Sequence, residues 1–94
     1  MSRPIVVVYD VTDDERRALV RNVLHPVALR LQQSTWMIAP QPGLTAAGAL
    51  SGLSLLLTGD DRLQAVQPCA GCRRHLRSAA SEPDPQAWLA SQVV

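Results

Sequence analysis

Residues 5–17 constrain the fold more than any other part of the chain. Residues 5–9 form a short apolar run, mostly β-branched, which is too short for a buried helix and predicts an interior β-strand. Thr12 and Glu15 have the spacing of a capping box, which predicts that a helix begins at Thr12. Asp10 therefore falls where the buried strand meets the helix. If the chain has a chemical centre, we expect it there.

The bulk composition indicates one folded domain. Ninety-four residues suffice for a single hydrophobic core, and 47% hydrophobic with 18% charged residues is ordinary for a globular protein. The net charge of +1 does not by itself indicate a nucleic-acid-binding protein. All nine basic residues are arginine, which genome composition would explain, although arginine also binds phosphate bidentately. The placement of the arginines is therefore more informative than their number.

No segment of the sequence has the pattern of a membrane or secretory element. Arg3 precedes only a short apolar run that an acidic cluster ends, which is not the pattern of a secretory signal. No stretch approaches about 20 uninterrupted apolar residues, so no membrane-spanning helix is expected. We therefore expect a cytoplasmic protein, in which Cys69 and Cys72 stay reduced.

The rest of the chain continues the alternation of helices and strands. An apolar stripe at helical spacing predicts that the first helix, up to Leu24, packs on a sheet; its members are Leu19, Val20, Val23, Leu24 and Val27. Residues 29–38 alternate and predict one half-solvated strand. Its outer polar face comprises Arg30, Gln32, Ser34 and Trp36. Residues 44–57 predict a second helix, and residues 62–67 a third strand.

This order predicts a ferredoxin-like α+β fold, a βαββαβ sandwich with an antiparallel sheet. We assign residues 1–78 to this domain. Residues 79–94 form a C-terminal tail that we expect to dock on the domain or on a dimer partner, as a helix or an edge strand. Asp84 and Pro85 could supply an N-cap and a first helical residue there.

Three segments resemble one known family, CRISPR-associated protein 2, the small subunit of CRISPR adaptation. Residues 7–17 resemble its "V-Y-D-V-x-D-D-x-R-R" opening, and residues 30–36 its "R-V-Q-x-S-V-F" second strand. Residues 61–72 resemble its "D-x-V-R-x-Y-x-L-C-x-x-C" segment. The chain departs from the family at Trp36 and Met37, where Phe-Glu is usual, and at Ala28, near the common Gly. Residues 78–94 match no part of the pattern.

The resemblance implies a function and a set of partners. Members of this family form ferredoxin-like homodimers that bridge two dimers of the CRISPR integrase subunit, CRISPR-associated protein 1, and contact the duplex DNA captured as a new spacer. Many are also described as metal-dependent endonucleases on RNA or DNA, with Mg²⁺ or Mn²⁺ as cofactor. Their metal ligand is the aspartate that ends the first strand, and this catalytic and metal-binding role carries over to Asp10 only.

Asp10 meets the needs of a metal ion only in a dimer. Mg²⁺ takes six oxygen ligands, so one carboxylate does not hold it, and the twofold-related carboxylate would have to approach across the interface. The alternative is that Asp10 is a turn residue at the end of a strand. Six arginines are candidates for phosphate contacts, with solvated surface side chains as the alternative: Arg16, Arg17, Arg30, Arg73, Arg74 and Arg77.

Cys69 and Cys72 have the spacing of half a zinc site or of a redox motif. His75 is a third possible zinc ligand. Packing of two small thiols is the interpretation that the sequence favours over metal binding or redox chemistry.

Three functions are consistent with these residues. The first is a CRISPR adaptation subunit with metal-dependent endonuclease activity at its dimer interface. The second is a toxin-like endoribonuclease of the same fold that has no integrase partner. The third is a ferredoxin-like regulatory module without catalysis.

Overall fold

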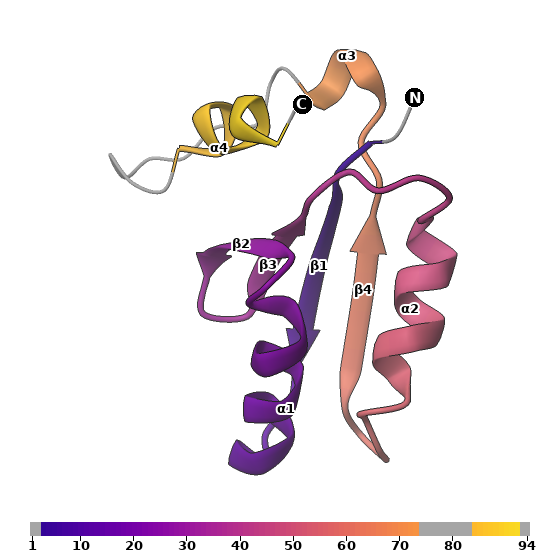
Figure 1. Cartoon of the computed structure of the whole chain (residues 1–94). Coiled ribbons are helices and arrows are strands. Elements are labelled where there is room, and N and C mark those ends of the chain that lie inside the picture. The colour runs from indigo at the N-terminus through magenta and orange to yellow at the C-terminus, as the bar shows by residue number, and fades with distance from the viewer. Residues whose placement is uncertain (1–2, 74–83, 93–94) are drawn as a thin grey trace.

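The strand that begins the chain lies inside the sheet and pairs on both sides. In the computed structural model, which describes residues 3–73 and 84–92, β1 (Ile5–Asp10) runs antiparallel to β3 (Thr35–Ile38) and to β4 (Arg62–Val66). Strand β2 (Ala28–Gln32) pairs with β3, so the strand order is β2-β3-β1-β4 (Figure 1). The predicted antiparallel sheet is confirmed, with β4 within one residue of its predicted range.

Two helices contribute to the core on one face of this sheet. Strand alternation sends Ile5, Val7 and Tyr9 of β1 to the same side, where all three are buried. Helix α1 (Asp14–Leu24) and helix α2 (Ala46–Ser54) run alongside the strands (Figure 1). Their buried residues join the same hydrophobic cluster, and they are Val20, Leu24, Ala49 and Leu53. The order β1-α1-β2-β3-α2-β4 confirms the predicted ferredoxin-like α+β fold.

The prediction of one strand over residues 29–38 is wrong. The chain turns back after β2, so these residues form the β2–β3 hairpin, with a bulge between Arg30 and Gln32. The register pairs Arg30 with Trp36, so the two share one side of the sheet as predicted. Because Trp36 also pairs with Val7, this is the core side and not a solvated one, and Trp36 is only 2% exposed. Its indole N–H donates a hydrogen bond of 3.0 Å to the Tyr9 hydroxyl, as a buried Trp requires.

Helix α1 begins two residues later than the predicted capping box places it. The N-cap is Asp13, and its carboxylate accepts a 2.9 Å hydrogen bond from the backbone N–H of Arg16. The cap thus satisfies the N–H of Arg16, whereas the predicted Thr12 cap would have satisfied that of Glu15. The charge of Asp13 also suits the helix dipole.

The apolar stripe of α1 is only partly buried. Val20 and Leu24 are 1% exposed, whereas Leu19, Val23 and Val27 remain 40–50% exposed. The face that α1 lays on the sheet is therefore narrower than predicted. Helix α2 is also shorter than predicted, because Thr45 caps it by accepting a 3.0 Å hydrogen bond from the N–H of Gly48.

Two further helices follow β4. Helix α3 is a single turn, Ala70–Arg73, and helix α4 spans Pro85–Ser91. Asp84 caps α4 with Pro85 in its first turn, as the sequence predicts. Helix α4 contacts β2 and buries Leu89. The division of the chain at residue 78 remains a prediction, because it falls within residues 74–83, outside the described residues.

The second face of the sheet keeps apolar side chains exposed. Alternation places Val6, Val8 and Asp10 of β1 on this face, and the β1–β4 register aligns them with Val66, Gln64 and Arg62. Val8 is 43% exposed and Val66 is 62% exposed. We call these six residues the open face. No helix in the described part of the chain is long and apolar enough to cross a membrane.

Candidate functional site

Asp10 lies at the edge of the open face. It is the last residue of β1 and is exposed, and its side chain forms no hydrogen bond or ion pair with any residue that the structure describes. Since Asp13 caps α1, Asp10 has no structural task at the helix start. The Asp10 carboxylate therefore lies between strand and helix, as the sequence predicts, and its exposed side chain is available to a ligand.

Arg62 is the nearest cross-strand neighbour of Asp10. The two are Cα partners in the β1–β4 register, and such pairs have Cβ atoms about 4.5–5.5 Å apart. Arg62 is exposed and makes no ion pair with a described residue. The sequence did not single out Arg62, because its place beside Asp10 depends on a strand pairing between distant parts of the chain. The candidate site therefore holds a carboxylate and a guanidinium side by side.

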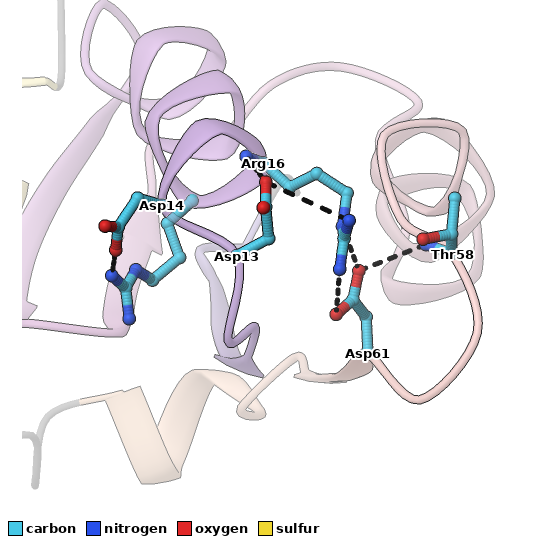
Figure 2. Close-up of polar contacts among 6 residues, drawn as sticks. Asp13, Asp14, Arg16, Thr58 and Asp61 are labelled. Carbon is cyan, nitrogen blue, oxygen red and sulfur yellow. Dashed lines mark hydrogen bonds and ion pairs between the residues drawn. The ribbon is translucent and has the colours of Figure 1, made fainter.

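Arg16 forms an ion pair with Asp61 and not with Asp10. Its Nε donates to Asp61 Oδ2 at 2.7 Å and its Nη2 donates to Asp61 Oδ1 at 3.1 Å (Figure 2). Asp61 also accepts a 3.1 Å hydrogen bond from the backbone N–H of Thr58, and its side chain is only 4% exposed. This bidentate pair ties the first turn of α1 to the loop between α2 and β4.

The geometry of the pair explains its electrostatics. The hydrogen bonds from Arg16 and then from Thr58 lower the pKa of Asp61, against a smaller opposing effect of desolvation. The hydrogen bond to Asp61 in turn raises the pKa of Arg16. Both groups are therefore charged at neutral pH, and each favours the charged form of the other.

The remaining predicted arginines lie on different elements. Arg17 forms an ion pair with Asp14 one turn earlier in α1. Arg30 Nη2 donates a 3.0 Å hydrogen bond to the Gln33 carbonyl, and its guanidinium lies 5.6 Å from the centre of the Trp36 ring. Of Arg73 only the backbone in α3 is described. The other two predicted contacts, Arg74 and Arg77, lie outside the described residues.

The described residues of one chain do not supply the ligands of a magnesium site. No group of three or more His, Cys, Asp or Glu side chains among them is placed to hold a metal ion. Asp10 offers one carboxylate where Mg²⁺ takes six oxygens, and Arg62 beside it is a competing cation. The described residues of one chain therefore do not complete a site for the expected Mg²⁺ or Mn²⁺.

The fold and the site together define a ferredoxin-like α+β protein with a free carboxylate at the end of its central strand. Two solved structures share this fold. The crystal structure of Streptococcus pyogenes Cas2 matches with a TM-score of 0.64 and 16% sequence identity, over 82% of this chain and 99% of that chain. A hypothetical protein from Thermus thermophilus, TT1823, matches with a TM-score of 0.62 and 27% identity, over 74% of this chain and 85% of the other.

These likenesses confirm the ferredoxin-like fold that the sequence motifs imply. No protein-family model and no curated protein matches the chain in sequence.

The Arg16–Asp61 pair predicts how stability depends on pH. Because the pKa of Asp61 is lowered in the folded state, the pair stabilises the fold fully above the unfolded pKa, which is about 3.9. This contribution is lost as the pH falls through the folded value. Asp61→Asn should therefore lower the free energy of unfolding at pH 7 and flatten its decline below about pH 4. Urea unfolding followed by tryptophan fluorescence measures both effects.

Asp60→Asn is the matched control, because Asp60 is exposed and contacts no described residue through a hydrogen bond or ion pair. We expect it to keep the wild-type profile. If Asp61→Asn showed the same acid dependence as the wild type, the pair would not be a stabilising element.

Proposed function

We propose that this chain is a CRISPR-associated subunit that acts in adaptation as a homodimer. In this proposal it bridges two dimers of the CRISPR integrase subunit, CRISPR-associated protein 1, and contacts the duplex DNA of the new spacer. The observation that carries the proposal is the fold shared with Streptococcus pyogenes Cas2 over 82% of the chain. The motif residues add support, because they lie at the β1–α1 junction, in the β2–β3 hairpin and along β4.

The open face supports self-association. Val8 and Val66 are large apolar side chains exposed on adjacent strands, and burying them against a second copy would remove them from water. A twofold axis through this face also brings each copy's Asp10 and Arg62 to the same interface. β4 is an edge strand of the sheet and offers unpaired backbone groups beside the open face.

The arginines divide into those available for phosphate and those already committed. Arg62 has no ion-pair partner among described residues, so its whole guanidinium is available for phosphate. Arg17 and Arg30 each use part of theirs, and a guanidinium has five N–H donors. Arg16 is the most committed, since Asp61 binds it bidentately. Of these four arginines, Arg62 has the most donors available for phosphate, although it was not among the arginines that the sequence singled out.

The endonuclease activity is the part of the proposal that depends most on the dimer. The described residues of one chain do not supply the ligands for Mg²⁺, so in this proposal the activity requires two copies of Asp10 that approach each other. Within a single chain, the residues can only present a carboxylate and bind a phosphate beside it. Cleavage of RNA or DNA by a strictly monomeric protein would therefore not involve a metal held in this way.

Asp10→Ala separates the scaffold from the nuclease. We expect the wild type to cleave RNA or duplex DNA in the presence of Mg²⁺ or Mn²⁺. The variant should cleave at least about 100-fold more slowly, as is typical when a group that stabilises charge in the transition state is removed. Both proteins should still dimerise and co-purify with the integrase subunit. Gel assays of cleavage and pull-down with that subunit measure the two properties.

Glu15→Gln is the control, because Glu15 is an exposed carboxylate in the first turn of α1. Cleavage that survives in Asp10→Ala would remove the catalytic assignment. A failure of the wild type to bind the integrase subunit would contradict the adaptation role and favour a toxin-like ribonuclease or a regulatory module.

Arg62→Ala tests the nucleic-acid contact. If Arg62 binds a phosphate, the variant should bind duplex DNA more weakly for every sequence tested. The negative slope of log affinity against log salt concentration should become shallower by about 1 for each Arg62 lost from the complex. Band-shift titrations at several salt concentrations measure this slope.

Arg16→Ala is the comparison, and it should change the slope less because Asp61 already binds that guanidinium. An Arg62→Ala protein with unchanged affinity and an unchanged salt slope would contradict the assignment of Arg62.

A further inference from the structure

A pair of thiols lies just beyond the free edge strand, and the proposed function does not use it. Cys69 precedes the single turn of α3, and Cys72 lies within that turn. Both cysteines are free and exposed. The backbone N–H of Cys72 donates a 3.2 Å hydrogen bond to Cys69 Sγ, so the turn folds the chain back onto the first sulfur.

The surroundings make the two thiols chemically unequal. Donation from the Cys72 thiol, followed by the backbone N–H groups of Cys72 and Gly71, lowers the pKa of Cys69, and the positive charge of Arg3 acts in the same direction. The same thiol contact raises the pKa of Cys72. Because the thiolate is the nucleophile, Cys69 is suited to attack an external disulfide first, and Cys72 is suited to resolve the mixed disulfide that results.

We propose that Cys69 and Cys72 form a thiol–disulfide exchange site that a low-molecular-weight disulfide oxidises. Cys69 thiolate attacks one sulfur of that disulfide, which forms a mixed disulfide and releases one thiolate. Cys72 then loses its proton and attacks Cys69 Sγ, which closes the Cys69–Cys72 bond and releases the second thiolate. Two electrons pass from the protein to the small disulfide, and the two cysteine protons end on the two released thiols.

The geometry permits this closure. The 3.2 Å hydrogen bond from the Cys72 backbone N–H to Cys69 Sγ holds the first sulfur beside the backbone of the second cysteine. This closeness suits a disulfide, whose Cα atoms lie about 4.4–6.8 Å apart. A zinc site is the competing use of the pair, but two thiolates supply only half of a four-ligand set. No group of three or more His, Cys, Asp or Glu in the described part of the chain is placed to hold a metal ion, and His75, the predicted third ligand, lies outside that part. In a reducing compartment the bond would form transiently.

The test follows the two steps separately on the full-length chain. Oxidised glutathione is added to the reduced wild type, to Cys69→Ser and to Cys72→Ser, and intact-protein mass spectrometry follows each reaction at pH 7. The wild type should end with an internal disulfide and no glutathione attached. Cys72→Ser should stop at one attached glutathione, because it lacks the second thiol. Cys69→Ser should form its mixed disulfide about tenfold more slowly than Cys72→Ser does, because Cys69 keeps the backbone N–H donors and the Arg3 charge that favour its thiolate.

Three results would overturn the proposal. One is a wild type that keeps glutathione on either cysteine at the end of the reaction. Another is an equal rate of mixed-disulfide formation in the two single variants, provided that circular dichroism shows both to be folded. The third is stoichiometric zinc binding by the reduced chain that protects both thiols from alkylation, which would identify a metal site instead.

Discussion

The pairing of β1 along both of its edges is the constraint on which the rest of the structure depends. Because side chains alternate along a strand, this pairing sends Ile5, Val7 and Tyr9 to the helices and leaves Val8 and Asp10 on the open face. A slip of one residue would exchange the two sets and expose the core. The packing that stabilises the fold therefore also fixes the place of the candidate carboxylate and of the arginine opposite it.

Charged groups in this protein fall into two classes with different consequences. Arg16 and Asp61 bind each other bidentately and join α1 to the loop before β4, so their charges serve the fold. Asp10 and Arg62 have no such partners among the described residues, although they lie opposite each other on adjacent strands. An adjacent free carboxylate and free guanidinium do not suffice for a metal ion, but they suit an interface with a second copy or with phosphate. The proposed contact with nucleic acid rests on this contrast and not on the net charge of +1.

The sequence predicted what depends on local pattern and missed what depends on distant pairing. The apolar run of β1 and the Asp84–Pro85 cap of α4 were predictable, because each follows from a few adjacent residues. The β2–β3 hairpin was not, since its bulge keeps the period of two across a turn. The Arg16–Asp61 pair spans 45 residues, and the place of Arg62 opposite Asp10 needs the strand register. No single-sequence pattern carries that information.

Cross-linking of two copies through position 10 tests the central claim most directly. The variant would carry Asp10→Cys, with Cys69→Ser and Cys72→Ser to remove the native thiols. If the open faces meet about a twofold axis with their strand ends together, mild oxidation should give a disulfide-linked dimer, since the two Cα atoms would approach within about 7 Å. The account would be contradicted if this variant stayed monomeric under the same oxidation although its thiol at position 10 reacted with glutathione as fast as a cysteine placed at an unrelated exposed position.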